Sequence, residues 1–180
     1  MNAGPVLVIC MGVSGCGKST LAHALAERLG FEFLEADDFH PERNRAWMAA
    51  GRPLDDDMRA PWIQSICDHL VAGPGPRPGA RTGWVMACSC LRRAHRQRFR
   101  ELGYPTRFLH LGARRDVLAA RMEGRRGHYM PVELLDSQLQ DLQSTAGEPD
   151  VVHLDAGPPS DAVVDAALAG LAEFLRGTRA

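Results

Sequence analysis

The stretch Gly12-Val13-Ser14-Gly15-Cys16-Gly17-Lys18-Ser19-Thr20 decides the fold. It matches the phosphate-binding pattern GxxxxGK[ST], between an apolar run of strand length at 6–11 and helically spaced apolar residues at 21–29. Glycines let the backbone curl so that amide N–H groups point at phosphate oxygens, and the helix N-terminus adds positive charge. We therefore expect these nine residues to bind the phosphates of a nucleotide, rather than to form a chance glycine-rich turn.

Two side chains of this loop have chemistry of their own. We expect the Lys18 ammonium group to reach the β- and γ-phosphates of the nucleotide. We expect the Ser19 hydroxyl group to ligate Mg²⁺.

The composition of the whole chain excludes several classes of protein. Its 180 residues fit one domain, and the net charge of −1 gives no positive field that would attract nucleic acid. No apolar run approaches the length of a membrane span, and no secretory signal is recognisable. The five cysteines lack metal-ligand spacing, which favours reduced thiols and a cytoplasmic location.

Apolar segments of strand and helix type alternate along the chain. Strands are predicted at 6–11, 31–36, 84–88, 107–111 and 151–155, and helices at 18–29, 41–50, 61–72, 91–102, 114–123, 131–142 and 160–175. This alternation predicts an α/β domain with a mainly parallel sheet that helices cover on both faces. In such sheets ligands bind beyond the C-terminal ends of the strands.

Carboxylates end the second predicted strand. Glu35 and Asp37 are two residues apart, so on a strand they share a face and can both look toward the phosphate site. A carboxylate there could hold Mg²⁺ through water or accept a proton from an alcohol nucleophile. The alternative is a polar strand end that caps the helix at Pro41, a role open to Asp38.

Arginines form three separate groups. Arg59 precedes a helix predicted to begin at Pro61, and its guanidinium group could bind a substrate carboxylate bidentately. We expect the arginines at positions 96, 98 and 100 to lie on a solvated helix face. The segment 124–131 is arginine-rich, punctuated by glycine and bounded by predicted helices, which is typical of a mobile lid.

Further motifs follow the phosphate loop in a fixed order. They are Ala36-Asp37-Asp38-Phe39-His40-Pro41 with Asn44, Gly51-Arg52-Pro53-Leu54-Asp55-Asp56, Arg59-Ala60-Pro61-Trp62, Ala87-Cys88-Ser89, Arg125-Arg126-Gly127-His128-Tyr129-Met130 and Ser137-Gln138. In this order they resemble the ATP-dependent gluconokinases, within the P-loop group that includes shikimate kinase and the nucleoside monophosphate kinases. The resemblance covers about residues 6–143.

The resemblance implies a P-loop three-layer fold with five parallel strands, helices on both faces and a mobile lid. It implies a substrate-binding helical segment at about 38–72, within a single kinase domain at 1–180. ATP and Mg²⁺ are the implied cofactors, and gluconate is the implied small-molecule substrate. The family further implies a homodimer, and the net charge and the short apolar runs argue against nucleic-acid and membrane partners.

The resemblance also implies roles for single residues. Asp37 would lie next to the attacking hydroxyl group, Glu35 in the outer shell of Mg²⁺, and Arg59 against the sugar acid. Arg121 would touch the nucleotide, and Arg125 the transferring phosphoryl group; Lys18, Asp37 and Arg125 are thus the predicted catalytic residues. Other members of the family motifs near the substrate are His40, Arg92, His128 and Gln138.

Three features depart from the family pattern. After Ser137-Gln138 the usual Leu-Glu-x-Pro ending is replaced by Leu142-Gln143-Ser144-Thr145. Trp47 stands where such enzymes commonly carry Lys, and Met58 where Asp is common. The leading prediction is transfer of the γ-phosphoryl group of ATP to the 6-hydroxyl group of gluconate. The alternatives are a kinase of another small hydroxylated acid, such as shikimate, or of a nucleoside-type acceptor, and a nucleotide-dependent switch without a metabolite substrate.

Overall fold

The computed structural model describes residues 4–74, 82–124 and 133–178. The elements follow in the order β1 (Val6–Met11), α1 (Lys18–Leu29), β2 (Glu32–Glu35), the 3-10 helix η1 (Ala36–Phe39), α2 (Glu42–Ala49), α3 (Asp56–Ala72), β3 (Gly83–Ala87), α4 (Arg93–Arg100), β4 (Thr106–Gly112), α5 (Arg115–Glu123), α6 (Glu133–Asp141), β5 (Val151–Asp155) and α7 (Ser160–Gly177).

The five strands form one parallel sheet in the order β2-β3-β1-β4-β5. β1 is the central strand, and all six of its residues are buried. Strands buried on both faces read as continuous apolar runs, which is why β1 was recognisable in the sequence. The predicted α/β fold with a parallel sheet is confirmed.

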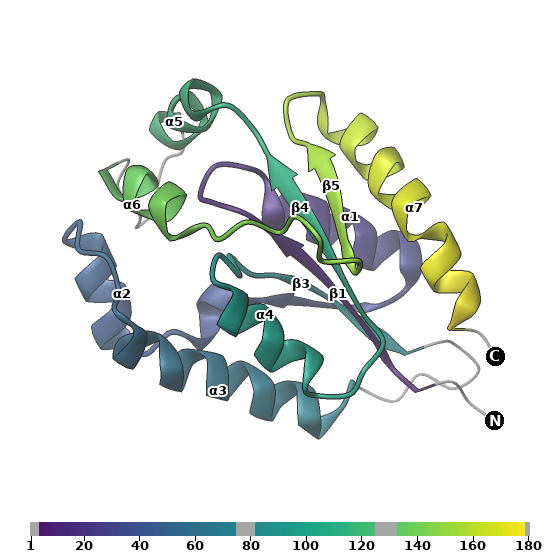
Figure 1. Cartoon of the computed structure of the whole chain (residues 1–180). Coiled ribbons are helices and arrows are strands. Elements are labelled where there is room, and N and C mark those ends of the chain that lie inside the picture. The colour runs from purple at the N-terminus through teal and green to yellow at the C-terminus, as the bar shows by residue number, and fades with distance from the viewer. Residues whose placement is uncertain (1–3, 75–81, 125–132, 179–180) are drawn as a thin grey trace.

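Side chains of β1 alternate between two apolar cores. Val6, Val8 and Cys10 pack with residues of α1 and α7, whereas Leu7, Ile9 and Met11 pack with residues of α3 and α4. Figure 1 shows the resulting three layers, with α1 and α7 on one face of the sheet and α3 and α4 on the other. Helices α2, α5 and α6 gather at the edge where the strands end, which is where ligands bind in such folds (Figure 1).

Most predicted boundaries differ from the observed ones by one or two residues, and two differences bear on the site. α3 begins at Asp56 rather than at Pro61, because the Asp55 carboxylate caps it by accepting a 2.8 Å hydrogen bond from Met58 N. Pro61 therefore lies inside the helix. β2 ends at Glu35, and Asp37 lies in η1, so the two carboxylates do not share a strand face.

The expectation of a solvated face on α4 was wrong for Arg96. Its side chain is fully buried and forms an ion pair with Glu148, with 2.6 Å between Arg96 Nη2 and Glu148 Oε1. Arg96 Nη1 also donates to the carbonyl groups of Cys90 and Leu91. Arg100 is largely buried against Glu148 too, whereas Arg98 is about half exposed. The side chain of Arg96 thus connects the loop after β3 to the loop before β5 through hydrogen bonds and an ion pair.

All five cysteines are buried as free thiols. Within the residues that the structure describes, no helix has the length and apolarity needed to cross a membrane. The predicted lid lies outside the described residues, apart from Gly124.

Candidate active site

The phosphate loop fits tightly against the end of β4 and against α5. Gly12, Gly15 and Gly17 all adopt positive φ angles, which side chains disfavour. A Cβ atom at Gly12 would lie 2.7 Å from the Leu111 carbonyl oxygen, and one at Gly15 would lie 2.8 Å from that of Leu118. Glycine is therefore required at both positions for the loop to curl around an anion at the start of α1.

Ser19 and Glu35 form a candidate magnesium site. Ser19 Oγ donates a 2.6 Å hydrogen bond to Glu35 Oε2, which joins the first turn of α1 to the end of β2. Burial raises the pKa of Glu35, and the nearby charge of Asp37 adds to this, although the bond from Ser19 and the charge of Lys18 oppose it. A bound cation would remove the burial penalty, and oxygen ligands of this kind suit Mg²⁺. The pair therefore fits the ion.

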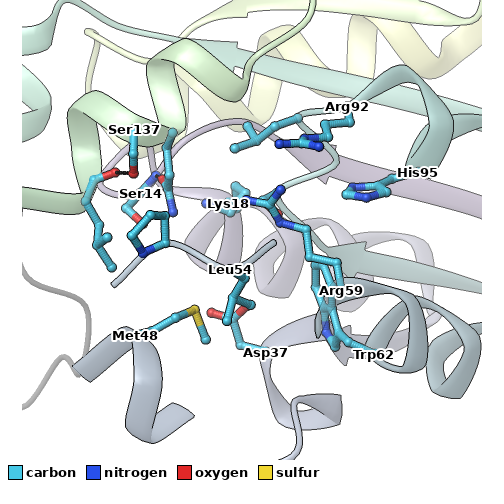
Figure 2. A pocket seen from close by; sticks show the side chains of 15 residues that line it. Ser14, Lys18, Asp37, Met48, Leu54, Arg59, Trp62, Arg92, His95 and Ser137 are labelled. Carbon is cyan, nitrogen blue, oxygen red and sulfur yellow. Dashed lines mark hydrogen bonds between the residues drawn. The ribbon is translucent and has the colours of Figure 1, made fainter. Parts of the chain in front are cut away.

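A cavity next to the phosphate loop brings together six of the predicted site residues: Ser14, Lys18, Asp37, Arg59, Arg92 and Gln138. Lys18 and Asp37 line it together with Arg59 and Arg92 (Figure 2). Lys18 Nζ donates a 3.0 Å hydrogen bond to the Val13 carbonyl group at the edge of the loop. A carboxylate, an ammonium group and two guanidinium groups thus face one space, a combination suited to an anionic acceptor beside a phosphate chain.

The opposite wall of this cavity is apolar. Met48, Leu54 and Leu134 form a small buried cluster against which Met58 packs, and the first three line the cavity. Figure 2 shows Met48 on the side away from Arg92 and His95. Trp47 does not line the cavity; its indole N–H group donates to the Pro53 carbonyl group.

Two buried aromatic side chains, Trp62 and His40, lie next to the segment that carries Asp37. Trp62 of α3 donates a 2.7 Å hydrogen bond to the Ala36 carbonyl group, and its ring stacks on that of His40 with 4.2 Å between centroids. His40 Nε2 lies 3.9 Å from Asp37 Oδ1, and Asn44 Nδ2 approaches His40 Nδ1 at 3.4 Å. His40 does not line the cavity, so it contacts the predicted base from behind.

Burial lowers the pKa of His40 to about 4, although Asp37 partly opposes this. The imidazole is therefore neutral at pH 7. Asn44 also donates to the Met58 carbonyl group through the same nitrogen, which fixes the orientation of its amide. With Asn44 as a donor, His40 Nδ1 accepts, and the ring proton is on Nε2, which faces Asp37.

Two arginines and two aspartates form a closed ring at the far end of the cavity. Asp141 accepts hydrogen bonds from Arg59 and Arg92, and Asp56 forms ion pairs with the same two arginines. Burial alone would raise the pKa of Asp141, but the bonds and charges of Arg92 and Arg59 lower it. Arg59 Nη1 is buried and has no hydrogen-bond partner among the described residues. Its distance of 3.7 Å to Asp56 Oδ1 is that of an ion pair without a hydrogen bond, so Nη1 can still donate one to an acceptor.

Gln138 connects α6 to the phosphate loop. Its side-chain oxygen accepts a 2.7 Å hydrogen bond from Ser14 N, and Gln138 also lines the cavity. Helix α6, which follows the predicted lid in the sequence, is therefore in direct contact with the phosphate loop.

A second cleft, of about 750 Å³, lies on the other side of the loop. Gly15, Gly17, Thr20 and Arg121 line it, together with residues 156–161 after β5. Arg121 Nη2 donates a 2.8 Å hydrogen bond to the Ala156 carbonyl group. The phosphate loop therefore separates this cleft, which has the size of a nucleoside site, from the acceptor cavity.

Arg125 and His128 lie outside the described residues, so their predicted roles stay predictions. Sequence reasoning missed two residues. His95 lines the acceptor cavity, and Asp141 bridges its arginines. The position of His95 near the start of the helix predicted after the third strand could have drawn attention to it, because ligands bind beyond the strand ends, whereas Asp141 gave no signal in the sequence.

Comparisons with known proteins agree with this geometry. A family model described as an AAA domain matches residues 7–149. A gluconokinase of Gluconobacter oxydans (strain 621H) is 38% identical over 165 residues, which cover 92% of this chain and 90% of that protein. The crystal structure of a gluconokinase from Sinorhizobium meliloti 1021 is 39% identical, covers 98% of this chain and 95% of that one, and superposes with a TM-score of 0.82.

A more distant structure shares the fold alone. Shikimate kinase from Aquifex aeolicus is 12% identical and superposes with a TM-score of 0.64, covering 93% of this chain and 96% of that one. The likeness agrees with the P-loop kinase architecture expected from the phosphate loop.

Proposed function

The chain belongs to the gluconokinase family, and from this premise we propose that it transfers the γ-phosphoryl group of ATP to the 6-hydroxyl group of gluconate. One observation supports the proposal above all others. Lys18 of the phosphate loop, the carboxylate of Asp37 and the guanidinium groups of Arg59 and Arg92 line the same cavity.

The acceptor side of the cavity suits a hydroxylated acid. Arg59 Nη1, which makes no hydrogen bond among the described residues and lies 3.7 Å from Asp56 Oδ1, can donate to the carboxylate of gluconate, while the opposite end of the substrate reaches Asp37. Buried donors without a partner favour a ligand that supplies the missing acceptor. Gluconate has this acceptor at one end and an alcohol at the other.

Phosphoryl transfer needs positioning and charge stabilisation rather than covalent chemistry by the protein. The amide groups of residues 12–20 and Lys18 would hold the phosphates, Arg121 the nucleotide, and Arg125 the charge on the transferring group. Ser19 and, through water, Glu35 would hold Mg²⁺, which neutralises charge on the β- and γ-phosphate oxygens when bound.

Asp37 would act as the general base. The bond from gluconate O6 to the γ-phosphorus forms as the bond from that phosphorus to the β–γ bridging oxygen breaks. The proton of the 6-hydroxyl group passes to the Asp37 carboxylate and then to water. His40 would present Nε2–H to Asp37 from behind and so orient it.

A second candidate is a kinase of another small hydroxylated acid. The apolar wall of Met48, Leu54 and Leu134 supports it, because an acceptor with fewer hydroxyl groups would leave fewer of them against apolar side chains. A coupled ADP-release assay with gluconate, shikimate, hexoses and nucleoside monophosphates separates the candidates. Preference for gluconate supports our proposal, and preference for any other acceptor contradicts it.

We also propose that residues 1–180 act as one kinase domain, with a lid at about 124–131 and a substrate-binding segment at about 38–72. That segment contains α2 and most of α3. The family membership supports a cytoplasmic homodimer that works on a small molecule.

A further inference from the structure

We propose that His95 determines acceptor specificity by hydrogen bonding to the hydroxyl group next to the acceptor carboxylate. This inference rests on the function proposed above, since it assigns one end of the acceptor to the arginines. The argument has three parts: where the ring lies, what its nitrogen atoms can bind, and how firmly it is held.

His95 lies at the arginine end of the acceptor cavity. It lines the cavity together with Arg59 and Arg92, and Figure 2 shows all three on the side away from Met48. The charges of both arginines act on the imidazole, as do those of Asp56 and Asp141. A carboxylate held by Arg59 would therefore place the neighbouring carbon and its hydroxyl group closest to this ring.

The ring nitrogens of His95 have no hydrogen-bond partner among the described residues; the ring makes an edge contact with Trp62, with 6.4 Å between centroids. Burial lowers the pKa of His95 to about 4, and the positive charges of Arg59 and Arg92 lower it further in the same direction. The neutral ring then carries one donor and one acceptor. A hydroxyl group is both donor and acceptor as well, so it matches either nitrogen.

The backbone beneath His95 is rigidly fixed. His95 lies in the first turn of α4, where its backbone N–H group donates to the Arg92 carbonyl group. The next residue, Arg96, is fully buried and bonded to the carbonyl groups of Cys90 and Leu91 and to Glu148. A polar group held in place by such a support can discriminate between ligands, because it cannot move to find another partner.

The half-buried imidazole of His95 loses contact with water when an acceptor binds. An acceptor without a hydroxyl group at this position leaves the ring without a hydrogen bond and therefore binds less tightly. Sites built to bond a substrate hydroxyl group reject analogues without it far more strongly than apolar pockets reject an extra group. We therefore expect the enzyme to prefer gluconate over 2-deoxygluconate by roughly 10- to 100-fold in kcat/KM.

The test compares gluconate with 2-deoxygluconate in the wild type and in His95→Phe. Phenylalanine keeps a ring against Trp62 but has no hydrogen-bonding atom. We expect the preference for gluconate to fall to about onefold in this variant, through loss of activity on gluconate and little change on 2-deoxygluconate. His95→Asn or His95→Gln, which keep an amide donor and acceptor, should recover part of the preference.

His23→Phe is the matched control, because His23 is exposed and stacks on Phe33 outside the cavity. A preference ratio in His95→Phe equal to that of the wild type would overturn the inference, as would equal losses on both acceptors. If His95→Phe does not fold, His95→Ala decides, because alanine also has no side-chain hydrogen-bonding atom. A wild-type preference for gluconate in His95→Ala would then overturn the inference. Absence of gluconate turnover in the wild type would overturn the proposed function and this inference together, whereas the ratios concern His95 alone.

Discussion

Ser19 Oγ lies 2.6 Å from Glu35 Oε2, so the hydroxyl group expected to ligate Mg²⁺ is bonded to the carboxylate expected in its outer shell. The two residues come from different elements, α1 and β2, and are 16 positions apart. The contact gives the magnesium proposal a testable form.

Glu35→Gln should raise the Mg²⁺ concentration needed for half-maximal activity by about 10- to 100-fold, the usual effect of losing an outer-shell partner. The amide keeps the shape of the side chain but loses the charge that attracts the cation. Steady-state rates over a Mg²⁺ titration measure this. Glu27→Gln, an exposed change on α1, is the control, and identical titration curves for both variants would speak against a role of Glu35.

Arg59→Ala should raise the KM for gluconate by about 10- to 100-fold, because a charge-assisted hydrogen bond to the acceptor carboxylate is lost. The KM for ATP should change little. The measurement is a pair of substrate titrations, with Arg28→Ala, an exposed change on α1, as control. An unchanged KM for gluconate would exclude Arg59 as the carboxylate anchor.

Arg96→Ala should destabilise the protein by about 3–5 kcal/mol, since it removes a fully buried partner of Glu148, which then keeps Arg100. The variant also leaves the buried carbonyl groups of Cys90 and Leu91 without the hydrogen bonds that Arg96 Nη1 donates. Arg98→Ala, two residues along the same helix, removes a half-exposed side chain and should cost less than about 0.5 kcal/mol. Urea unfolding of both variants measures the difference. Equal losses would show that the buried ion pair contributes nothing beyond a surface one.

This pair of arginines also shows where sequence reasoning stops. The phosphate loop and the bounds of β1, α1 and β5 could be predicted, because local patterns determine them. The burial of Arg96 could not, since its partner Glu148 lies 52 residues further along the chain. The same holds for Asp141, which approaches Arg59 across 82 positions. Contacts of this kind depend on how the helices pack, so they cannot be predicted from local sequence patterns.

The stability of the protein should fall as the pH is lowered from about 6.5 to about 4. Burial lowers the pKa of His40 to about 4, so between these values the unfolded chain binds a proton that the folded protein does not. Above pH 6.5 the titration of His40 takes nothing from the free energy of unfolding. By pH 4 it lowers this free energy by roughly 2–3 kcal/mol.

His40→Phe provides the comparison, because it keeps a ring on Trp62 and cannot titrate. Its unfolding free energy should depend less steeply on pH in this window than that of the wild type. Parallel pH profiles of the two proteins, obtained from denaturant unfolding, would contradict the assignment of a depressed pKa to His40.

The central claim is that Asp37 and the phosphate loop act on one alcohol across the cavity they share. The decisive measurement follows phosphate-ester formation from ATP and gluconate by ³¹P NMR, in the wild type, in Asp37→Asn and in the exposed neighbour variant Asp38→Asn. We predict a 6-phosphate ester at similar rates in the wild type and Asp38→Asn, and a rate lower by about 10²- to 10⁴-fold in Asp37→Asn with ATP binding intact. Near-normal ester formation in Asp37→Asn, or none from gluconate in the wild type, would contradict the account.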